Sequence, residues 1–303
     1  MKRIFGDAKT DLFIALALFT AFYLWCLWRG IRAHPDGARP APSKEAAAAG
    51  FVTAFFDTLG IGSFATTTSI FRQWRLVRDE LIPGTLNVGI TLPTVVQAYI
   101  YTRLIPVDSR TLILMIAASV LGAWLGAGVV AGWSRPRIQV GMGTALLVAA
   151  AIMLGTILEV LPGGGVALAL TGPKLAVAVL GNFLLGALMT LGIGLYAPCL
   201  ILVSLLGLTP TAAFPIMMGS CAFLMPIASA RFIRVNRYDL RASLGLAIGS
   251  IPAVFLAAFI VKSLPLTAVR WLVIAVVVYT AIGLLRAARR ERVLGAPPLQ
   301  ASS

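Results

Sequence analysis

Long apolar runs separated by short basic gaps make up most of the chain. A run of about 20 apolar residues is long enough to cross the hydrocarbon core of a bilayer. Residues 175–230 form a 56-residue stretch without a charge, which is too long for one span and is interrupted at GIGLYAP and GLTPT. The other runs are 12–28, 46–71, 81–102, 111–134, 138–158, 242–261 and 264–285. The pattern predicts an all-α polytopic membrane protein with about eight or nine hydrophobic helical segments.

Composition and charge agree with that reading. The chain is 59% hydrophobic and 12% charged, whereas a soluble domain carries about 25% charged residues. Its net charge of +14 comes from 25 Lys and Arg against 11 Asp and Glu. Because the arginines lie in the gaps between apolar runs, they fit the rule that juxtamembrane basic residues orient membrane proteins. We therefore expect the lipid bilayer as a partner and no nucleic acid.

The two ends of the chain are expected to lie outside the core formed by the other apolar runs. Residues 1–44 are predicted to form an N-terminal membrane anchor and a linker. A signal peptide is the alternative, but no small-x-small cleavage motif follows the first run, which favours a retained anchor. Tyr23, Trp25 and Trp28 are then expected at the membrane–water interface, as in aromatic belts. Residues 287–303 are predicted to be a basic, disordered tail.

The chain also resembles itself. Residues 57–70, DTLGIGSFATTTSI, align with residues 189–202, MTLGIGLYAPCLIL, at an offset of 132. This predicts two homologous transmembrane repeats, at residues 45–161 and 173–286. Basic residues counted over the loops favour an inverted over a parallel arrangement of the repeats by a narrow margin.

Each predicted repeat carries a Gly-x-Gly in a membrane segment. Gly60 and Gly62 in the first repeat correspond to Gly192 and Gly194 in the second. Glycine opens a helix because it adopts backbone conformations that other residues avoid. The half-helix beyond such a break begins with free N–H groups, which attract anions, and Pro198 suits its first turn. Helix packing is the alternative role of these glycines, but their paired occurrence favours a substrate site.

Polar side chains near the breaks extend the candidate substrate site. Hydroxyls follow the first break at Ser63 and Thr66, and the second at Tyr196. In the next segment, Asn87, Thr91 and Thr94 share one helical face, which either lines a pathway or joins helices. The predicted substrate-binding residues are Gly60, Gly62, Ser63, Thr66, Asn87, Gly192, Gly194, Tyr196 and Ser220, the last being the repeat partner of Asn87.

Asp57 is the one acid in the interior of an apolar run. A carboxylate inside a membrane segment is a functional hypothesis by default. Protonation of Asp57 would permit anion binding nearby and couple transport to protons. The alternatives are that Asp57 caps backbone N–H groups at the helix break or that it pairs with an interfacial arginine.

The segments quoted as GFVTAFFDTLGIGSFATTTSIF, ELIPGTLNVGITLPTVVQAYIY, ASVLGAWLGAGVV and IQVGMGTALLV together resemble the TauE/SafE family of sulfite-exporter-like permeases. The resemblance covers roughly residues 46–286. It implies transport of a small anion such as sulfite or an organosulfonate, and a multi-pass location in the cytoplasmic (inner) membrane of a bacterium. Many members carry a longer glycine run after the first Gly-x-Gly, whereas here Ser63 and Phe64 follow Gly62.

Together these features predict a secondary permease for a small anion, and not an enzyme. The chain has no GxxxxGK[ST] phosphate-binding loop, no HExxH and no Ser-His set, because its single histidine, His34, lies in the linker. No cofactor or metal is expected, and a homo-oligomer is compatible with the sequence. The alternatives are a membrane scaffold or assembly subunit, which would not need duplicated breaks, and a cation carrier that uses Asp57.

Overall fold

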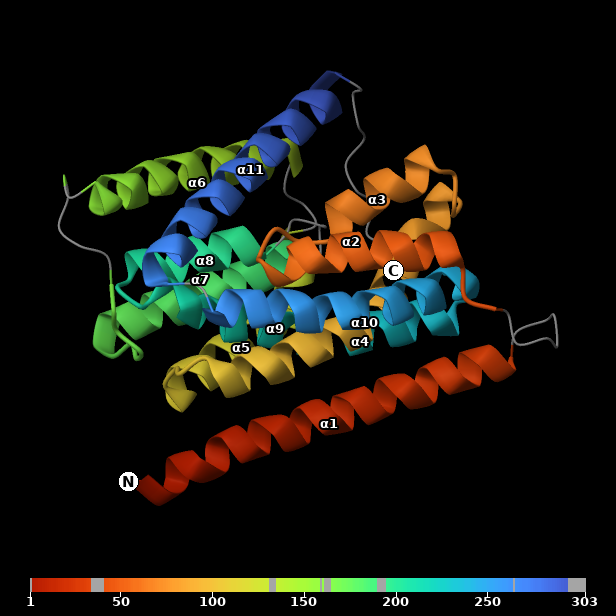
Figure 1. The fold of residues 1–303 in the computed structure, drawn as a ribbon, viewed down its shortest axis with the longest axis horizontal. Coiled ribbons are helices and arrows are strands. Elements are labelled where there is room, and N and C mark those ends of the chain that lie inside the picture. Colours follow the sequence, from red (N-terminus) through yellow and green to blue (C-terminus); the bar gives the residue numbers. More distant parts are fainter. Residues whose placement is uncertain are drawn as a thin grey trace. The chain divides into compact units, whose positions relative to one another are not determined.

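The computed structural model describes residues 2–33, 41–130, 135–158, 160, 165–189, 195–263 and 265–293. Within these ranges the chain forms eleven α-helices and two short 3₁₀ turns (Figure 1). The one strand-like feature of the described residues is an isolated bridge between Ala167 and Leu208. The predicted all-α class is confirmed.

The helices follow one another with short connections. They are α1 (Lys2–Arg32), α2 (Lys44–Thr58), α3 (Phe64–Gln73), α4 (Ile82–Leu104), α5 (Ser109–Val130), α6 (Arg135–Ile157), α7 (Gly172–Met189), α8 (Tyr196–Leu205), α9 (Ala213–Arg234), α10 (Leu240–Ser263) and α11 (Leu266–Val293). The 3₁₀ turns η1 (Asp79–Leu81) and η2 (Pro210–Ala212) precede α4 and α9.

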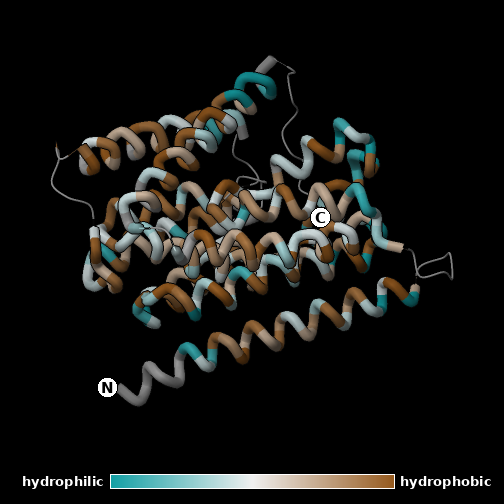
Figure 2. The backbone as a smooth tube through the Cα atoms, in the orientation of Figure 1, coloured by the Kyte–Doolittle hydropathy of each residue, from teal (hydrophilic) through white to brown (hydrophobic). Residues whose placement is uncertain are grey.

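Six described helical segments are long and apolar enough to cross a membrane: Lys9–Arg32, Asp79–Leu104, Gly172–Met189, Pro210–Arg234, Leu240–Ile260 and Trp271–Glu291. Figure 2 shows apolar residues along these helices. The chain is therefore a membrane protein, as predicted. The predicted run 46–71 is not one span, because it divides into α2, of 15 residues, and α3, of 10.

Helix α1 corrects one detail of the sequence reading. Trp25 and Trp28 are exposed, and the guanidinium groups of Arg29 and Arg32 lie over their rings. Tyr23 is instead buried, and its hydroxyl donates a 2.6 Å hydrogen bond to the carbonyl oxygen of Val88 in α4. Tyr23 therefore packs α1 against α4 and does not lie in an aromatic belt.

The chain forms two compact units. The first comprises Met1–Leu104 and Cys221–Ser263, and the second comprises Ile105–Ser220 and Leu264–Ser303. Each unit therefore contains helices from both predicted repeats.

In the first unit, α2 and α10 run parallel with their backbones in close contact. Ser43 at the start of α2 donates its N–H to the carbonyl of Arg241, at 3.0 Å. One helical turn later, a Cβ on Gly249 would meet the carbonyl oxygen of Ala47. Near the other end Ala54 packs against Ala253 and Val254. Small residues permit this approach, as they do in membrane helix pairs generally.

The second unit contains a comparable parallel pair, α5 and α7. The Asn182 amide donates to the carbonyl oxygen of Met115 at 2.7 Å, and a Cβ on Gly186 would meet the carbonyl oxygen of Ser119. Helices α6 and α11 of the same unit pair in the antiparallel sense, with the Gln139 amide donating to Glu291 at 3.1 Å.

The order of elements recurs along the chain. The series α2, α3, η1, α4, α5, α6 has the same order of long and short helices as α7, α8, η2, α9, α10, α11. In each unit the parallel pair joins one helix from each series, α2 with α10 and α7 with α5. This pattern supports a duplication. The repeat boundaries 45–161 and 173–286, and their inverted orientation, stay predictions.

The glycines of the parallel pairs yield a stability prediction. Gly249→Ala and Gly186→Ala should each destabilise the protein by about 1–3 kcal/mol, because the new methyl group would force a neighbouring backbone carbonyl away. Thermal unfolding in detergent measures this. The control is Gly283→Ala in α11, where a Cβ would meet no atom within 4 Å. Equal melting temperatures for the two groups of variants would contradict close backbone packing.

Candidate functional site

The first Gly-x-Gly does open a helix. Helix α2 ends at Thr58 and α3 begins at Phe64. Between them Gly60 has φ +98° and Gly62 has φ +84°, a region that side-chain-bearing residues avoid. The Gly60 N–H still bonds to the carbonyl oxygen of Asp57, at 2.8 Å. The predicted break is confirmed in the first repeat.

Asp57 lies at this break and is 3% exposed. One carboxylate oxygen accepts the backbone N–H of Ser63 at 2.6 Å, and the other accepts Nε2 of Gln97 at 2.9 Å. Asp57 thus satisfies a donor immediately before α3, as the capping alternative of the sequence analysis predicts. Capping does not exclude proton coupling, which stays a proposal.

Gln97 of α4 joins this carboxylate to its surroundings. Its Nε2 also donates to the hydroxyl of Thr58 at 2.8 Å, and that hydroxyl donates to the carbonyl oxygen of Ala54 at 2.7 Å. Tyr101, one turn further along α4, donates its hydroxyl to the Thr58 carbonyl at 3.0 Å. Oε1 of Gln97 has no hydrogen-bond partner among the described residues, although the side chain is fully buried.

No basic side chain of the described residues forms an ion pair with Asp57. An isolated carboxylate in an apolar interior is costly unless it is paired or neutralised. Nor do three or more His, Cys, Asp or Glu side chains gather anywhere in the described ranges, as a metal site would require. The hydrogen bonds to the carboxylate come from the N–H and the hydroxyl of Ser63 and from the Gln97 amide.

The hydroxyls after the break have structural partners. Thr66, which is half-buried, donates to the carbonyl oxygen of Ser63 at 2.9 Å. Thr67, which is buried, donates to Thr53 at 3.0 Å and so joins α3 to α2. Ser63 contributes its backbone N–H to the site.

In the first part of the polar stripe on α4, one residue, Thr91, bonds to another helix, while Asn87 and Thr94 bond to carbonyl oxygens of α4 itself. Asn87 donates its amide to the carbonyl oxygen of Pro83 at 2.9 Å and makes no hydrogen bond to the Asp57 cluster. Thr91 pairs with Ser229 of α9 at 2.9 Å. The same stripe continues at helical spacing to Gln97 and Tyr101. That continuation was the signal for Gln97, which the sequence analysis missed.

The candidates from the second repeat lie in the other unit. Tyr196 is the buried first residue of α8, and Pro198 lies in the first turn of that helix as predicted. Ser220 donates its hydroxyl to the carbonyl oxygen of Ile216 at 2.8 Å and accepts the Asn182 amide at 3.3 Å. Gly192 and Gly194 lie outside the described residues.

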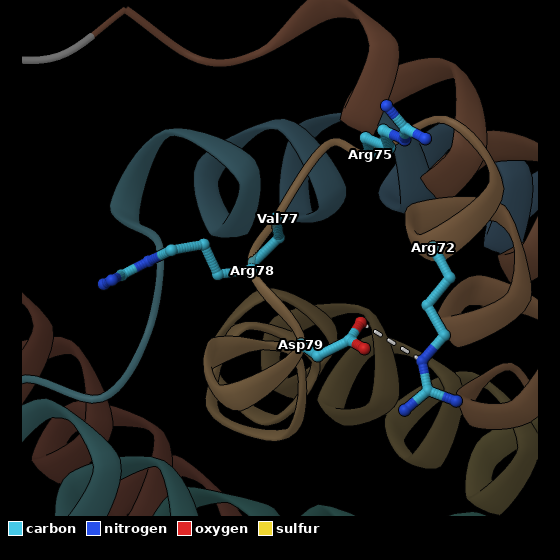
Figure 3. Close-up of a pocket in the computed structure, with 5 residues that line it drawn as sticks. All are labelled: Arg72, Arg75, Val77, Arg78 and Asp79. Atoms are coloured by element: carbon cyan, nitrogen blue, oxygen red, sulfur yellow. Dashed lines mark hydrogen bonds and ion pairs between the residues drawn. The ribbon is translucent and has the colours of Figure 1, made fainter.

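A basic pocket lies at the other end of α3 (Figure 3). It has a volume of about 410 Å³ and is lined by Arg72, Arg75, Val77, Arg78 and Asp79. Arg72 pairs with Asp79 at 3.2 Å. Arg75 has φ +53°, and the residue at the same place in the second repeat is Gly207, with φ +98°. The arginine therefore stands where glycine would fit without strain.

Comparison with known protein families identifies one match. The family model described as "Sulfite exporter TauE/SafE" matches residues 5–154. The match includes α1, so the expectation that the resemblance begins near residue 46 is wrong. No curated protein and no solved structure matched the chain.

The break itself can be tested through its backbone strain. Gly62→Ala should cost about 1–2 kcal/mol, because alanine at a positive φ brings its Cβ against its own backbone. A Cβ at Gly62 would meet no other atom within 4 Å, so steric overlap with neighbours cannot account for the loss. Gly141→Ala in α6 is the control, since it also meets nothing within 4 Å but lies in a regular helix. If both variants have the melting temperature of the wild type in detergent, the left-handed backbone at Gly62 is wrong.

Proposed function

Residues 5–154 belong to the TauE/SafE family, and on that basis we propose that the chain is a secondary permease for a small anion. Sulfite and small organosulfonates are the proposed substrates, and the cytoplasmic membrane is the proposed location. Members of this family are transporters, and no catalytic role is proposed for the chain. The observation that supports the proposal best is the helix break between Thr58 and Phe64.

Open backbone at membrane depth is tolerated only where protein buries it or where it lines a cavity. At this break the chain presents the first N–H groups of α3, together with the positive end of that helix dipole. Gly62 borders open space, because a Cβ there would meet nothing within 4 Å. Backbone N–H groups beside open space suit a small oxyanion, which needs several donors and no deep pocket.

Proton coupling through Asp57 is the second part of the proposal. The carboxylate is buried and, among the described residues, without an ion pair. A bound proton would remove its charge, and so would remove its repulsion of an anion at the break. Gly60, Gly62, Ser63 and Thr66 are the proposed substrate-binding residues of the first unit. Asn87, Tyr196 and Ser220 remain proposals for the pathway, as do Gly192 and Gly194.

A cation carrier is the competing function that a specific observation favours. The same unpaired carboxylate, with the unused oxygen of Gln97 in the adjoining side chain, offers oxygen ligands to a cation. One carboxylate and one amide oxygen are few ligands for a bare cation. An imposed sodium gradient in the transport experiment separates the two functions.

Flux into and out of proteoliposomes tests the proposal. Labelled sulfite, a small organosulfonate and sulfate are compared under imposed proton and sodium gradients. We expect saturable flux of sulfite or the organosulfonate that responds to the proton gradient. Gly62→Leu combined with Gly194→Leu should reduce it at least tenfold, since leucine rarely adopts the positive φ of Gly62 and Gly194 belongs to the second predicted break.

The matched control is Gly141→Leu combined with Gly283→Leu, two helical positions where a Cβ meets nothing within 4 Å. These variants should keep the flux of the wild type. Absence of flux for every anion tested would contradict a permease for small anions. Flux driven by sodium without any anion would instead support the cation carrier.

A further inference from the structure

The position that an oxyanion would take at the start of α3 is already occupied by a side chain of the protein. Helix α3 runs from Phe64 to Gln73, and the N–H of Ser63, directly before it, points to Asp57 at 2.6 Å. A carboxylate at this place carries the same charge and the same type of oxygen as a sulfite or sulfonate. Two anions cannot share one N–H group without strong repulsion.

Gln97 is bonded in a one-sided way. Both of its described hydrogen bonds come from Nε2, to Asp57 at 2.9 Å and to Thr58 at 2.8 Å, while Oε1 has no described partner. A buried carbonyl oxygen without a donor costs about 1–3 kcal/mol. This arrangement suits an ionised carboxylate, which accepts hydrogen bonds and donates none.

The same amide suits the protonated carboxyl after a half turn about its last bond. Oε1 would then lie where Nε2 lies now and would accept the carboxyl proton of Asp57. The side chain therefore has a partner for Asp57 in either protonation state. A leucine or methionine at position 97 would offer Asp57 no hydrogen-bond partner in either protonation state.

Among the residues that the structure describes, no other charge faces Asp57 from the elements packed on α2. Helix α4 contributes Tyr101, whose hydroxyl bonds to Thr58. The face of α10 against α2 carries glycine, serine, alanine and valine in the described residues, and Arg241 at its start bonds to the Ala41 carbonyl. On α3, Arg72 is paired with Asp79. A change of charge in this cluster therefore arises at Asp57.

We propose that Asp57 is a tethered competitor of the transported anion, and that Gln97 positions its side chain in the released state. A proton taken up by the carboxyl removes the charge that strengthens its bond to Ser63. The Gln97 amide turns and accepts that proton in a hydrogen bond, and the substrate anion takes the freed N–H. Loss of the proton restores the carboxylate, which displaces the anion. One proton and one anion then cross in the same direction. This inference rests on the proposed function.

Binding of methanesulfonate to the purified protein tests the competition, because this anion keeps one charge from acidic to neutral pH. In the wild type we expect affinity to rise about tenfold for each unit that the pH falls, above the point where Asp57 becomes protonated. Asp57→Asn should bind the anion with an affinity that does not change with pH. Gln97→Met should shift the pH dependence toward higher pH, because the carboxylate loses the charge-assisted hydrogen bond from Nε2, which is stronger than the neutral bond that the protonated carboxyl loses. Gln97→Asn should restore part of the wild-type dependence.

Infrared difference spectra give a signal that would not change if Asp57 and Gln97 only stabilised the fold. Adding methanesulfonate to the wild type should produce the C=O band of a protonated carboxyl, which should be missing in Asp57→Asn and shifted in Gln97→Met. Thermal melting identifies variants that fail to fold. Should Asp57→Asn be one of them, the wild-type band and its shift in Gln97→Met decide the question.

The outcomes separate this inference from the proposed function. If the wild type neither binds nor transports any anion, both are wrong. If it transports an anion but binds it without protonating a carboxyl, or if Asp57→Asn keeps the pH dependence of the wild type, only the competition at α3 is overturned.

Discussion

The constraint on which the site depends is that a backbone leaving its helix inside an apolar protein must satisfy its own polar groups. At the end of α2 the chain meets this constraint with a side chain: Asp57 accepts the Ser63 N–H, and Gln97 supports Asp57. Gly60 and Gly62 make the turn possible, since both have positive φ. The carboxylate is needed because a buried N–H group without an acceptor is costly. The carboxylate that satisfies the Ser63 N–H is thus also a titratable group, and it lies where an anion would bind.

Close packing of the helices holds this break in position. Glycines bring the backbones of α2 and α10 together, so that Ala47 and Gly249 touch without side chains between them. Apolar side chains gain little by leaving lipid for protein, and contact of small residues therefore carries much of the association. Because α2 is fixed along its length, the opening after Thr58 is a local departure from a firmly held helix. The carboxylate of Asp57 and the amide of Gln97 can then keep a constant separation while their hydrogen bonds change.

Much of this arrangement was predictable from the sequence, for identifiable reasons. The hydrophobic runs predicted the helices, and the repeated Gly-x-Gly predicted a break that the structure shows at Gly60 and Gly62. Other features were not accessible. The pairing of α2 with α10 and of α7 with α5 depends on contacts between distant segments. Gln97 was missed because an amide in an apolar run gives a weak signal alone, and its partner lies 40 residues away. Tyr23 was misplaced because the burial of an aromatic ring depends on which helix covers it.

An anion site made of backbone N–H groups has a physical advantage over one made of arginine. A guanidinium keeps its charge at all relevant pH values, so a buried arginine would hold an anion whether or not transport required its release. Backbone N–H groups attract an anion with a fixed, moderate strength, and a neighbouring carboxylate can cancel that attraction or leave it intact.

The arginines of the α3–α4 connection are placed accordingly: Arg72, Arg75 and Arg78 are exposed at the far end of α3. With ten residues, α3 is about 15 Å long. Exposed basic groups at that distance raise the local concentration of anions, while in our proposal release is left to a group that a single proton can neutralise.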